Sequence, residues 1–138
     1  MLKTRLLHPE LLGALGSAGH GSKVLIADGN FPFISGANPG AKRVYLNLAP
    51  GLVTVTDVLK VLIEVMPVEA AEVMMPASGP EPDIFGEFRQ FLAGLELKKI
   101  GRFEFYDLAR ERDPVLVIAT GEQRVYANLL LTIGVVSP

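Results

Sequence analysis

The stretch GHGSKVLIADGN, residues 19–30, places a run of apolar residues between two sets of turn-forming residues. The run itself, Lys23–Ala27, is short and rich in branched side chains, which predicts a buried β-strand. Glycine and small polar residues on either side predict turns before and after it. Four further segments have the apolar content or the alternation of a strand. They are Arg43–Leu48, Ala71–Met75, Val115–Ala119 and Asn128–Val136.

Helical periodicity is clearest between Val55 and Met66, where apolar residues recur at intervals of three and four. Thr54, with Asp57 three residues later, predicts a capped start for this helix, and Pro67 predicts its end. Three shorter segments complete the pattern: helices at Glu10–Ser17 and Pro82–Ala93, and Phe103–Arg110, which fits either a helix or a strand. Helices alternating with apolar strands predict the α/β class. We expect residues 1–138 to form a single layered domain, with a central sheet flanked by helices.

The composition excludes several classes of protein. Of the 138 residues, 49% are apolar and only 20% are charged, and the formal net charge is −2. A protein that binds nucleic acid by neutralising phosphates needs an excess of positive charge, which this chain lacks. The apolar fraction is too high for a disordered chain. The longest strongly apolar stretch, Leu129–Val136, is too short to cross a membrane, and no signal peptide follows Lys3 and Arg5. We therefore expect part of the apolar surface to be covered by another subunit.

Common catalytic and binding motifs are missing from the sequence. The two histidines do not have the spacing of metal ligands. The absence of cysteine excludes disulfides and is compatible with a reducing cytoplasm. The segment Gly36–Lys42 lacks the spacing of a phosphate-binding loop, so we interpret it as a turn that leads into a strand. Gly19 and Gly21 lack the third glycine of a dinucleotide-binding fingerprint. No serine-nucleophile motif is present.

Polar residues at the ends of the apolar runs are the remaining candidates for chemistry. His20 lies between two glycines and can give and take a proton near neutral pH. Asp28 and Glu122 each follow a predicted strand, where ligands bind in open α/β sheets. Tyr126 and Asn128, two residues apart, would share one face of a strand. Each of these residues also fits a plain turn, cap or sheet-edge position, so the pattern alone leaves both interpretations open.

Two motifs together resemble a known family. Residues 19–32, GHGSKVLIADGNFP, are similar to the signature of the D-ribose pyranase and L-fucose mutarotase family (RbsD/FucU), and Thr120-Gly121-Glu122 followed by Tyr126-Ala127-Asn128 resembles its second motif. The resemblance extends from Leu2 to about Val136. It implies a family-type α/β fold and an isomerase that interconverts anomers or ring forms of a free monosaccharide without a cofactor or metal.

The resemblance also implies roles for individual residues. His20 matches the family's catalytic proton donor, and Asp28 matches a substrate-binding aspartate. Tyr126, Ala127 and Asn128 match the substrate-binding tripeptide, and Arg102 resembles the arginine of the fucose-type branch. Glu122 and Tyr106 are accessory candidates.

The branch and the partners follow from the same resemblance. The stretch Val73–Pro76 is fucose-like, whereas Ala127 is more typical of the ribose branch and the Arg110–Pro114 connection is longer than in fucose-type members. We expect L-fucose as substrate, with D-ribose or a non-catalytic sugar-binding role in uptake as alternatives. The family implies a cytoplasmic homo-oligomer, commonly a decamer, with sites between subunits and no nucleic-acid or membrane partner. We expect His20 and Asp28 to face Tyr126 and Asn128 across that contact.

Overall fold

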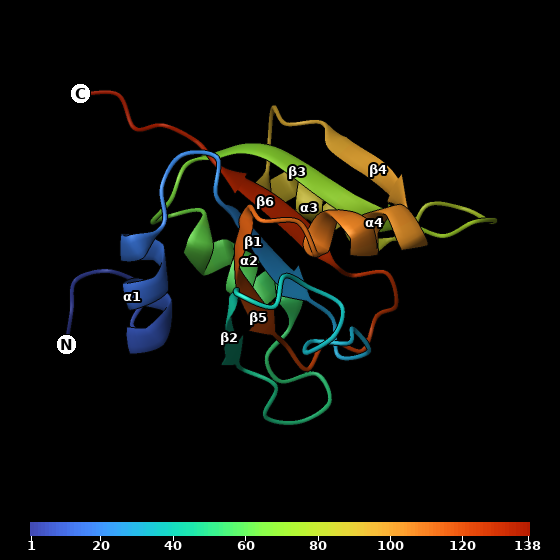
Figure 1. Cartoon of the computed structure of the whole chain (residues 1–138), viewed down its shortest axis with the longest axis horizontal. Helices are drawn as coiled ribbons and strands as arrows, with labels where there is room; N and C mark the ends of the chain where they lie inside the picture. Colours follow the sequence, from blue (N-terminus) through green and yellow to red (C-terminus); the bar gives the residue numbers. More distant parts are fainter.

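A single six-stranded sheet organises the computed structural model, which describes all residues, 1–138 (Figure 1). The strands are β1 (Lys23–Ala27), β2 (Lys42–Tyr45), β3 (Val68–Met75), β4 (Leu97–Gly101), β5 (Pro114–Ala119) and β6 (Leu129–Ile133). Their order across the sheet is β2-β5-β1-β6-β3-β4. Only β6 runs against its neighbours, β1 and β3; all other neighbouring strands are parallel. Five strands therefore end at the same edge, which we call the carboxyl edge; the opposite edge is the amino edge.

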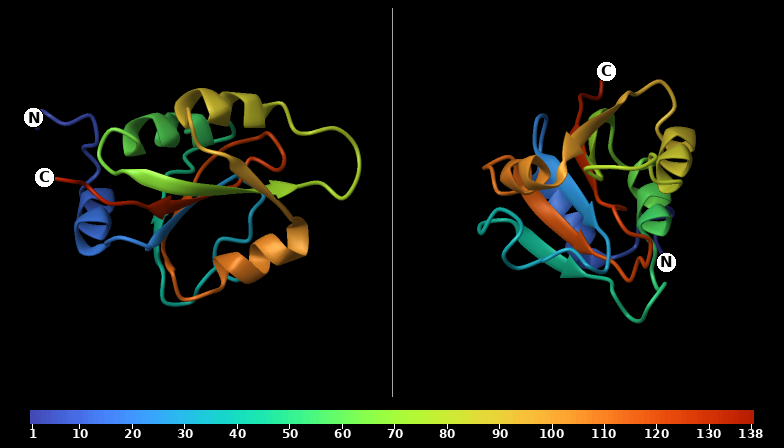
Figure 2. Two further views of the ribbon diagram at one scale, coloured as in Figure 1. Left: turned by 90° about the horizontal axis from the view of Figure 1, so that it is seen from above. Right: turned by 90° about the vertical axis from the view of Figure 1, so that its right-hand side faces the viewer.

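Four helices cover the sheet: α1 (Pro9–Ser17), α2 (Val55–Leu62), α3 (Ile84–Phe91) and α4 (Arg102–Ala109). The helices α2 and α3 lie on one face, and α4 lies on the other (Figure 2). The helix α1 packs beside β2. This arrangement confirms the predicted α/β domain with a central sheet flanked by helices. None of the four helices is long and apolar enough to span a lipid bilayer.

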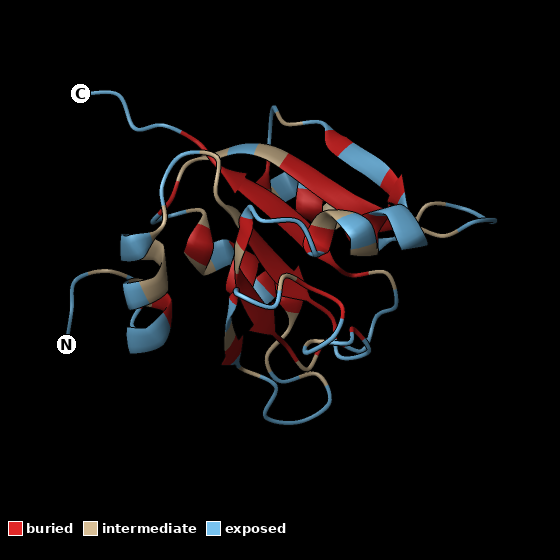
Figure 3. Cartoon of the chain, viewed as in Figure 1, coloured by how far each residue is buried: buried red, intermediate tan, exposed pale blue.

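Coverage of both faces buries the central strands β1, β5 and β6 almost entirely, whereas the outer strands β2 and β4 stay partly exposed (Figure 3). A larger core of 23 residues lies between the sheet and α2 and α3, and a smaller core of 11 residues lies on the face covered by α4. Phe85 and Phe88 of α3 are fully buried in the larger core, and Phe105 of α4 is fully buried in the smaller one. Each such ring contributes about 1.5–3 kcal/mol through apolar burial.

The helix α2 begins as the sequence predicts and ends earlier. Asp57 N–H donates to Thr54 Oγ1 at 3.1 Å, and Thr54 N–H donates to Asp57 Oδ2 at 3.0 Å, which completes a capping box. The helix ends at Leu62, because the next residues turn back and the N–H groups of Val65 and Met66 both donate to the Leu62 carbonyl. Pro67 comes after this turn, so the prediction that it ends the helix is wrong.

The strand β4 has no counterpart in the sequence predictions. It lies at one side of the sheet, where Leu97 and Ile100 are buried while Lys98 and Lys99 are exposed. Exposed lysines are common on such outer strands because they discourage pairing with other chains, but they also weaken the apolar pattern of a strand. The ambiguous segment that follows forms the helix α4.

Two glycine substitutions test the packing of the carboxyl edge. A Cβ at Gly121 would lie 2.2 Å from the Ala49 carbonyl oxygen and 2.6 Å from that of Leu52, whereas a Cβ at Gly86 in α3 would meet nothing within 4 Å. We expect Gly121→Ala to lower the free energy of unfolding by about 1–3 kcal/mol, as overpacking does. Gly86→Ala should raise it by about 0.5–1 kcal/mol, because alanine is the better helix former.

Urea denaturation of both variants beside the unmodified protein measures these changes. An unchanged midpoint for Gly121→Ala would contradict the close backbone approach at this position.

Candidate functional site

The candidate residues lie at opposite edges of the sheet. Asp28 follows β1, Arg102 follows β4 and Tyr126–Asn128 precede β6, which places all of them at the carboxyl edge. His20 precedes β1 at the amino edge. The five residues of β1, at about 3.3 Å each, separate the two edges by about 17 Å. Within one chain, His20 is therefore out of reach of the other candidates.

A small hollow of about 150 Å³ opens among the candidates at the carboxyl edge. We call it the carboxyl-edge hollow. Its walls combine polar groups with aromatic and apolar side chains. They are Asp28, Asn30, Phe31, Met74, Arg102, Tyr106, Val125, Tyr126 and Asn128. A few polar groups set among apolar walls are typical of a site for a small organic molecule.

Asp28 and Asn128 form the buried centre of this hollow. Asp28 N–H donates to Asn128 Oδ1 at 2.8 Å, and Asn128 Nδ2 donates to Asp28 Oδ2 at 3.1 Å. The same carboxylate accepts N–H donors from Asn30, at 3.0 Å, and from Ala127, at 3.2 Å. Asp28 and Asn128 are each 3% exposed. Their pairing ties the turn after β1 to the loop before β6.

This pairing corrects one prediction. Asp28 contacts Asn128 within the same chain, so it does not face that residue across a contact between copies. Burial raises the pKa of Asp28, and the hydrogen bonds that its carboxylate accepts from Asn30, Ala127 and Asn128 offset part of that rise. Because these bonds occupy the carboxylate, the geometry makes Asp28 a residue that holds the loop in place.

Arg102 and Tyr106 enter the hollow from α4. Arg102 is the first residue of the helix, immediately after β4, and its guanidinium lies 5.8 Å from the centre of the Tyr106 ring. Arg110 lies 5.5 Å from the same ring, and the Phe31 ring centre is 5.6 Å away. The nearby Tyr106 side chain raises the pKa of Arg102, whose guanidinium is charged at any physiological pH. Tyr106 is thus packed on several sides, while Arg102 remains exposed to a ligand.

The segment from Tyr126 to Asn128 is a loop, contrary to the prediction that it opens the last strand; β6 begins at Leu129. Tyr126 has a φ of 58°, in the left-handed region that non-glycine residues rarely adopt. With this φ at Tyr126, the segment cannot follow the regular alternation of side chains that a strand would have. Even so, Tyr126 and Asn128 line the same hollow.

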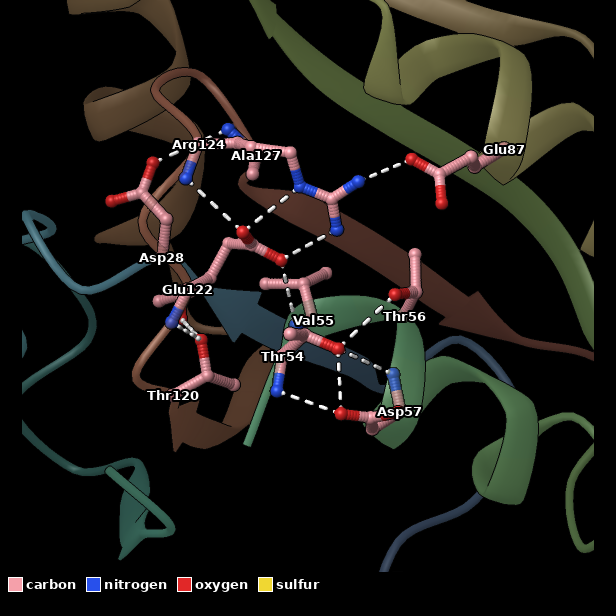
Figure 4. A network of polar contacts seen from close by, with 11 residues as sticks. Asp28, Thr54, Val55, Thr56, Asp57, Glu87, Thr120, Glu122, Arg124 and Ala127 are labelled. Carbon is pink, nitrogen blue, oxygen red and sulfur yellow. Dashed lines mark hydrogen bonds and ion pairs between the residues drawn. The ribbon is translucent and has the colours of Figure 1, made fainter. Parts of the chain in front are cut away.

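Glu122 and Arg124 form a second polar network beside the first (Figure 4). Glu122 is 3% exposed, and its carboxylate accepts from Arg124 Nε at 2.9 Å and Arg124 Nη2 at 2.8 Å. It also accepts the backbone N–H groups of Val55, at 3.2 Å, and Arg124, at 3.1 Å. Burial raises the pKa of Glu122, but these hydrogen bonds and the positive charge of Arg124 outweigh it, so the pKa lies below the ordinary value.

Sequence reasoning did not find Arg124. No residue pattern marks it, because a lone arginine in a polar loop is ordinary. Its only sequence signal is its position two residues after Glu122.

His20 has its own surroundings at the amino edge. Its Nε2 lies 3.0 Å from Oε1 and Oε2 of Glu69, which follows the first residue of β3. The imidazole is 58% exposed and borders a separate, largely apolar hollow of about 390 Å³ that includes Val65, Met66 and Val136. This geometry leaves the ring available to a molecule approaching from outside the chain.

A larger polar hollow of about 440 Å³ lies on the other side of the turn at 28–30 and is lined by residues that follow β1, β2 and β5. It includes Asn30, which also lines the carboxyl-edge hollow, together with Asn47 and Gln123. No three side chains of His, Asp or Glu come together in a way that could hold a metal ion.

Comparisons with known proteins agree over the whole chain. Residues 1–136 match the model of the "RbsD / FucU transport protein family". A fucose mutarotase of Bos taurus is 34% identical over 147 residues, covering 96% of this chain and 92% of the relative. A D-ribose pyranase of Paracidovorax citrulli is 34% identical over 142 residues, covering 98% of both chains.

Two solved structures have the same fold. A fucose mutarotase of Streptococcus pneumoniae in complex with L-fucose superposes with a TM-score of 0.84 at 30% identity, covering 99% of this chain and 100% of the other. A Bacillus subtilis RbsD complexed with D-ribose superposes with a TM-score of 0.81 at 31% identity, with the same coverage. The similarity to fucose-type and to ribose-type proteins is therefore nearly equal.

The lowered pKa of Glu122 predicts a pH dependence of stability. Its ionised form stabilises the fold fully above the ordinary pKa of 4.5, and this contribution is lost as the pH falls through the lower folded-state pKa. We expect Glu122→Gln to be less stable than the unmodified protein near pH 7, with the difference narrowing as the pH falls from about 5 to about 3. Thermal unfolding followed by circular dichroism across this range measures the difference.

Glu104→Gln is the matched control, because Glu104 is exposed on α4 and forms no ion pair. Glu104→Gln should lower the stability near pH 7 less than Glu122→Gln does. A difference for Glu122→Gln that does not change with pH would contradict the stabilising role of the ionised carboxylate.

Proposed function

The chain belongs to the RbsD/FucU transport protein family, and from this premise we propose that it is a cofactor-independent mutarotase that interconverts the anomers of L-fucose. Its named relatives are isomerase-type enzymes of free sugars. The observation that carries the proposal is the carboxyl-edge hollow, where Asn128, Arg102 and Tyr126 surround a space suited to one small polar molecule.

The chemistry of mutarotation fits these residue types. Opening the sugar ring requires a proton delivered to the ring oxygen and a proton removed from the anomeric hydroxyl; closure on the other carbonyl face reverses both transfers. We assign the proton transfer to His20, with Glu69 orienting its ring through the contact at Nε2. General acid–base help of this kind accelerates a reaction by about 10²–10⁴-fold. Such a gain suits a reaction that already proceeds in water.

In the proposed complex, each polar group of the hollow has a distinct role. Arg102, Tyr126 and the amide of Asn128 bind sugar hydroxyls, and Ala127 contributes its backbone to the same loop. Asp28 orders that loop through the bonds its carboxylate accepts. Tyr106 supports Arg102 from α4. Glu122 lies outside the walls of the hollow and takes no part in the proposed reaction.

A second copy of the chain completes the site in this proposal. His20 lies about 17 Å from the hollow of its own chain, so the proton-transferring histidine comes from a neighbouring subunit. Exposed apolar side chains flank both places: Phe103 and Val125 near the hollow, and Val65 and Val136 near His20. Burial of these side chains between copies would cover apolar surface that a single chain leaves exposed. We propose a ring-like homo-oligomer, a decamer as in the family it resembles, acting in the cytoplasm.

Two other functions have support of their own. D-ribose is the alternative substrate, because ribose-type relatives are as similar as fucose-type ones and Ala127 is typical of that branch. Arg102 favours L-fucose. A non-catalytic sugar-binding role is favoured by the description of the family as a transport protein family. It would need the hollow but not His20.

His20→Ala separates catalysis from binding. We expect it to lose the acceleration of anomer exchange, about 10²-fold or more, while it keeps most of the sugar affinity, because the hollow is formed by other residues. Exchange NMR on equilibrated L-fucose and D-ribose measures the acceleration, and saturation-transfer NMR measures binding. Exchange no faster with the unmodified protein than without it would leave only the binding role.

Mixed oligomers test the shared site. The test co-expresses His20→Ala with Tyr126→Asn, where asparagine tolerates the left-handed backbone. When the two variants are present in equal amounts, about a quarter of the sites should combine an intact His20 with an intact Tyr126. Activity near that fraction supports a site built from two copies. No recovery of activity, or a fully active monomer in sedimentation, would contradict it.

Arg102→His tests the choice of sugar. We expect the ratio of kcat/KM for L-fucose to that for D-ribose to fall about tenfold, because histidine cannot donate the paired hydrogen bonds of a guanidinium. Exchange rates over a range of sugar concentrations give both values. Arg110→His is the matched control, since Arg110 packs on the same Tyr106 ring from outside the hollow. An unchanged ratio for Arg102→His would remove Arg102 as the selector.

A further inference from the structure

Glu122 is a buried carboxylate for which the proposed reaction has no use. It is 3% exposed, yet its pKa is lowered, so it carries a negative charge inside the protein at neutral pH. An isolated buried charge is strongly unfavourable, and a partner must compensate it. Arg124 supplies that partner through its Nε, its Nη2 and its backbone N–H.

Arg124 and Glu122 together link the loop to two helices. Its Nη1 donates to Glu87 of α3, while Glu122 accepts the N–H of Val55, the first residue of α2. Figure 4 shows Arg124 between the two carboxylates. The start of the loop between β5 and β6 is therefore fixed to the layer of helices on one face of the sheet.

The end of the same loop is fixed separately. Ala127 N–H and the Asn128 amide donate to Asp28. Tyr126 lies between these two attachment points, with its φ of 58°. A non-glycine residue holds such a conformation only when its surroundings impose it.

We propose that Arg124 is a positioning residue: by pairing with Glu122 and Glu87 it holds the loop so that Tyr126 points into the carboxyl-edge hollow. Arg124 itself is absent from the walls of that hollow. Its effect on a sugar thus passes through Tyr126. The inference rests on the proposed function only for the identity of the ligand.

Loss of the guanidinium should weaken sugar binding more than catalysis. Tyr126 binds the sugar, and an interaction equally strong in the ground and transition states changes KM and leaves kcat alone. For Arg124→Met we expect KM for L-fucose to rise about tenfold with kcat within about twofold of the unmodified protein. Exchange NMR over a range of sugar concentrations gives the two constants. A fall in kcat with KM unchanged would overturn the proposal.

A second measurement needs no sugar. Ala127 N–H lies on the far side of Tyr126 from Arg124, so its hydrogen exchange reports the order of the whole loop. In Arg124→Met this exchange should accelerate about tenfold, while the amides of β1 stay as they are. Equal acceleration in β1 and at Ala127 would mean that Arg124 only stabilises the fold, and the proposal would fail.

Two further variants separate the effect of pairing from loss of an arginine. Arg124→Lys keeps the charge without the forked geometry and should recover part of the affinity. Arg89→Met removes the ion pair between Arg89 of α3 and Glu81, which precedes that helix. Neither residue lines the hollow, so this variant should leave KM unchanged. A raised KM in Arg89→Met, or no recovery in Arg124→Lys, would contradict the positioning role.

Failure of the proposed function would look different. If the unmodified protein does not accelerate exchange of L-fucose or D-ribose, the mutarotase proposal fails, while the hydrogen exchange of Ala127 still tests whether Arg124 orders the loop. If exchange is accelerated and Arg124→Met matches the unmodified protein in KM and in Ala127 exchange, only the positioning role fails.

Discussion

The pairing of Asp28 with Asn128 is the interaction on which the carboxyl edge depends. The two residues are 100 positions apart in sequence and exchange two hydrogen bonds out of contact with water. Removing either partner would leave buried donors or acceptors without a partner, at a cost of about 1–3 kcal/mol each. The pairing joins the turn after β1 to the loop before β6, and it forms the floor against which Arg102 and Tyr106 of α4 complete the hollow.

The pKa values of the two buried carboxylates at this edge, Asp28 and Glu122, are shifted in opposite directions. At Asp28 burial dominates and raises the pKa, because the carboxylate has only neutral N–H donors around it. At Glu122 the guanidinium of Arg124 reverses the effect of burial and lowers the pKa. The first group orders the loop through several neutral contacts, whereas the second orders it through one strong ionic partner. The two attachments act on the same connection, residues 120–128, from different sides.

Local sequence patterns predicted the parts of the fold that obey local rules. The run Lys23–Ala27 and the capping residues Thr54 and Asp57 gave a buried strand and a helix start that the structure confirms. The lysines of β4 weakened its pattern, so that strand was missed. The structure places the candidates Asp28, Tyr126 and Asn128 at the carboxyl edge, and their roles stay predictions. The left-handed φ of Tyr126 and the hydrogen bonds of Arg124 depend on contacts with residues far along the chain. No periodicity encodes such contacts. The positions of His20 before the strand Lys23–Ala27 and of Asp28 after it, in contrast, already follow from the sequence prediction.

The position of β6 also bears on how the chain folds during synthesis. This strand, Leu129–Ile133, lies in the middle of the sheet, between β1 and β3. Until the ribosome has passed Ile133, β1 and β3 each present an unpaired backbone edge flanked by apolar side chains, and the loop with Tyr126 has no anchor. Sheets closed by such distant pairings fold slowly, and their open edges favour association with other chains. The carboxyl-edge hollow is therefore among the last features to form in a nascent chain, and a polypeptide stopped short of β6 would be a template for aggregation.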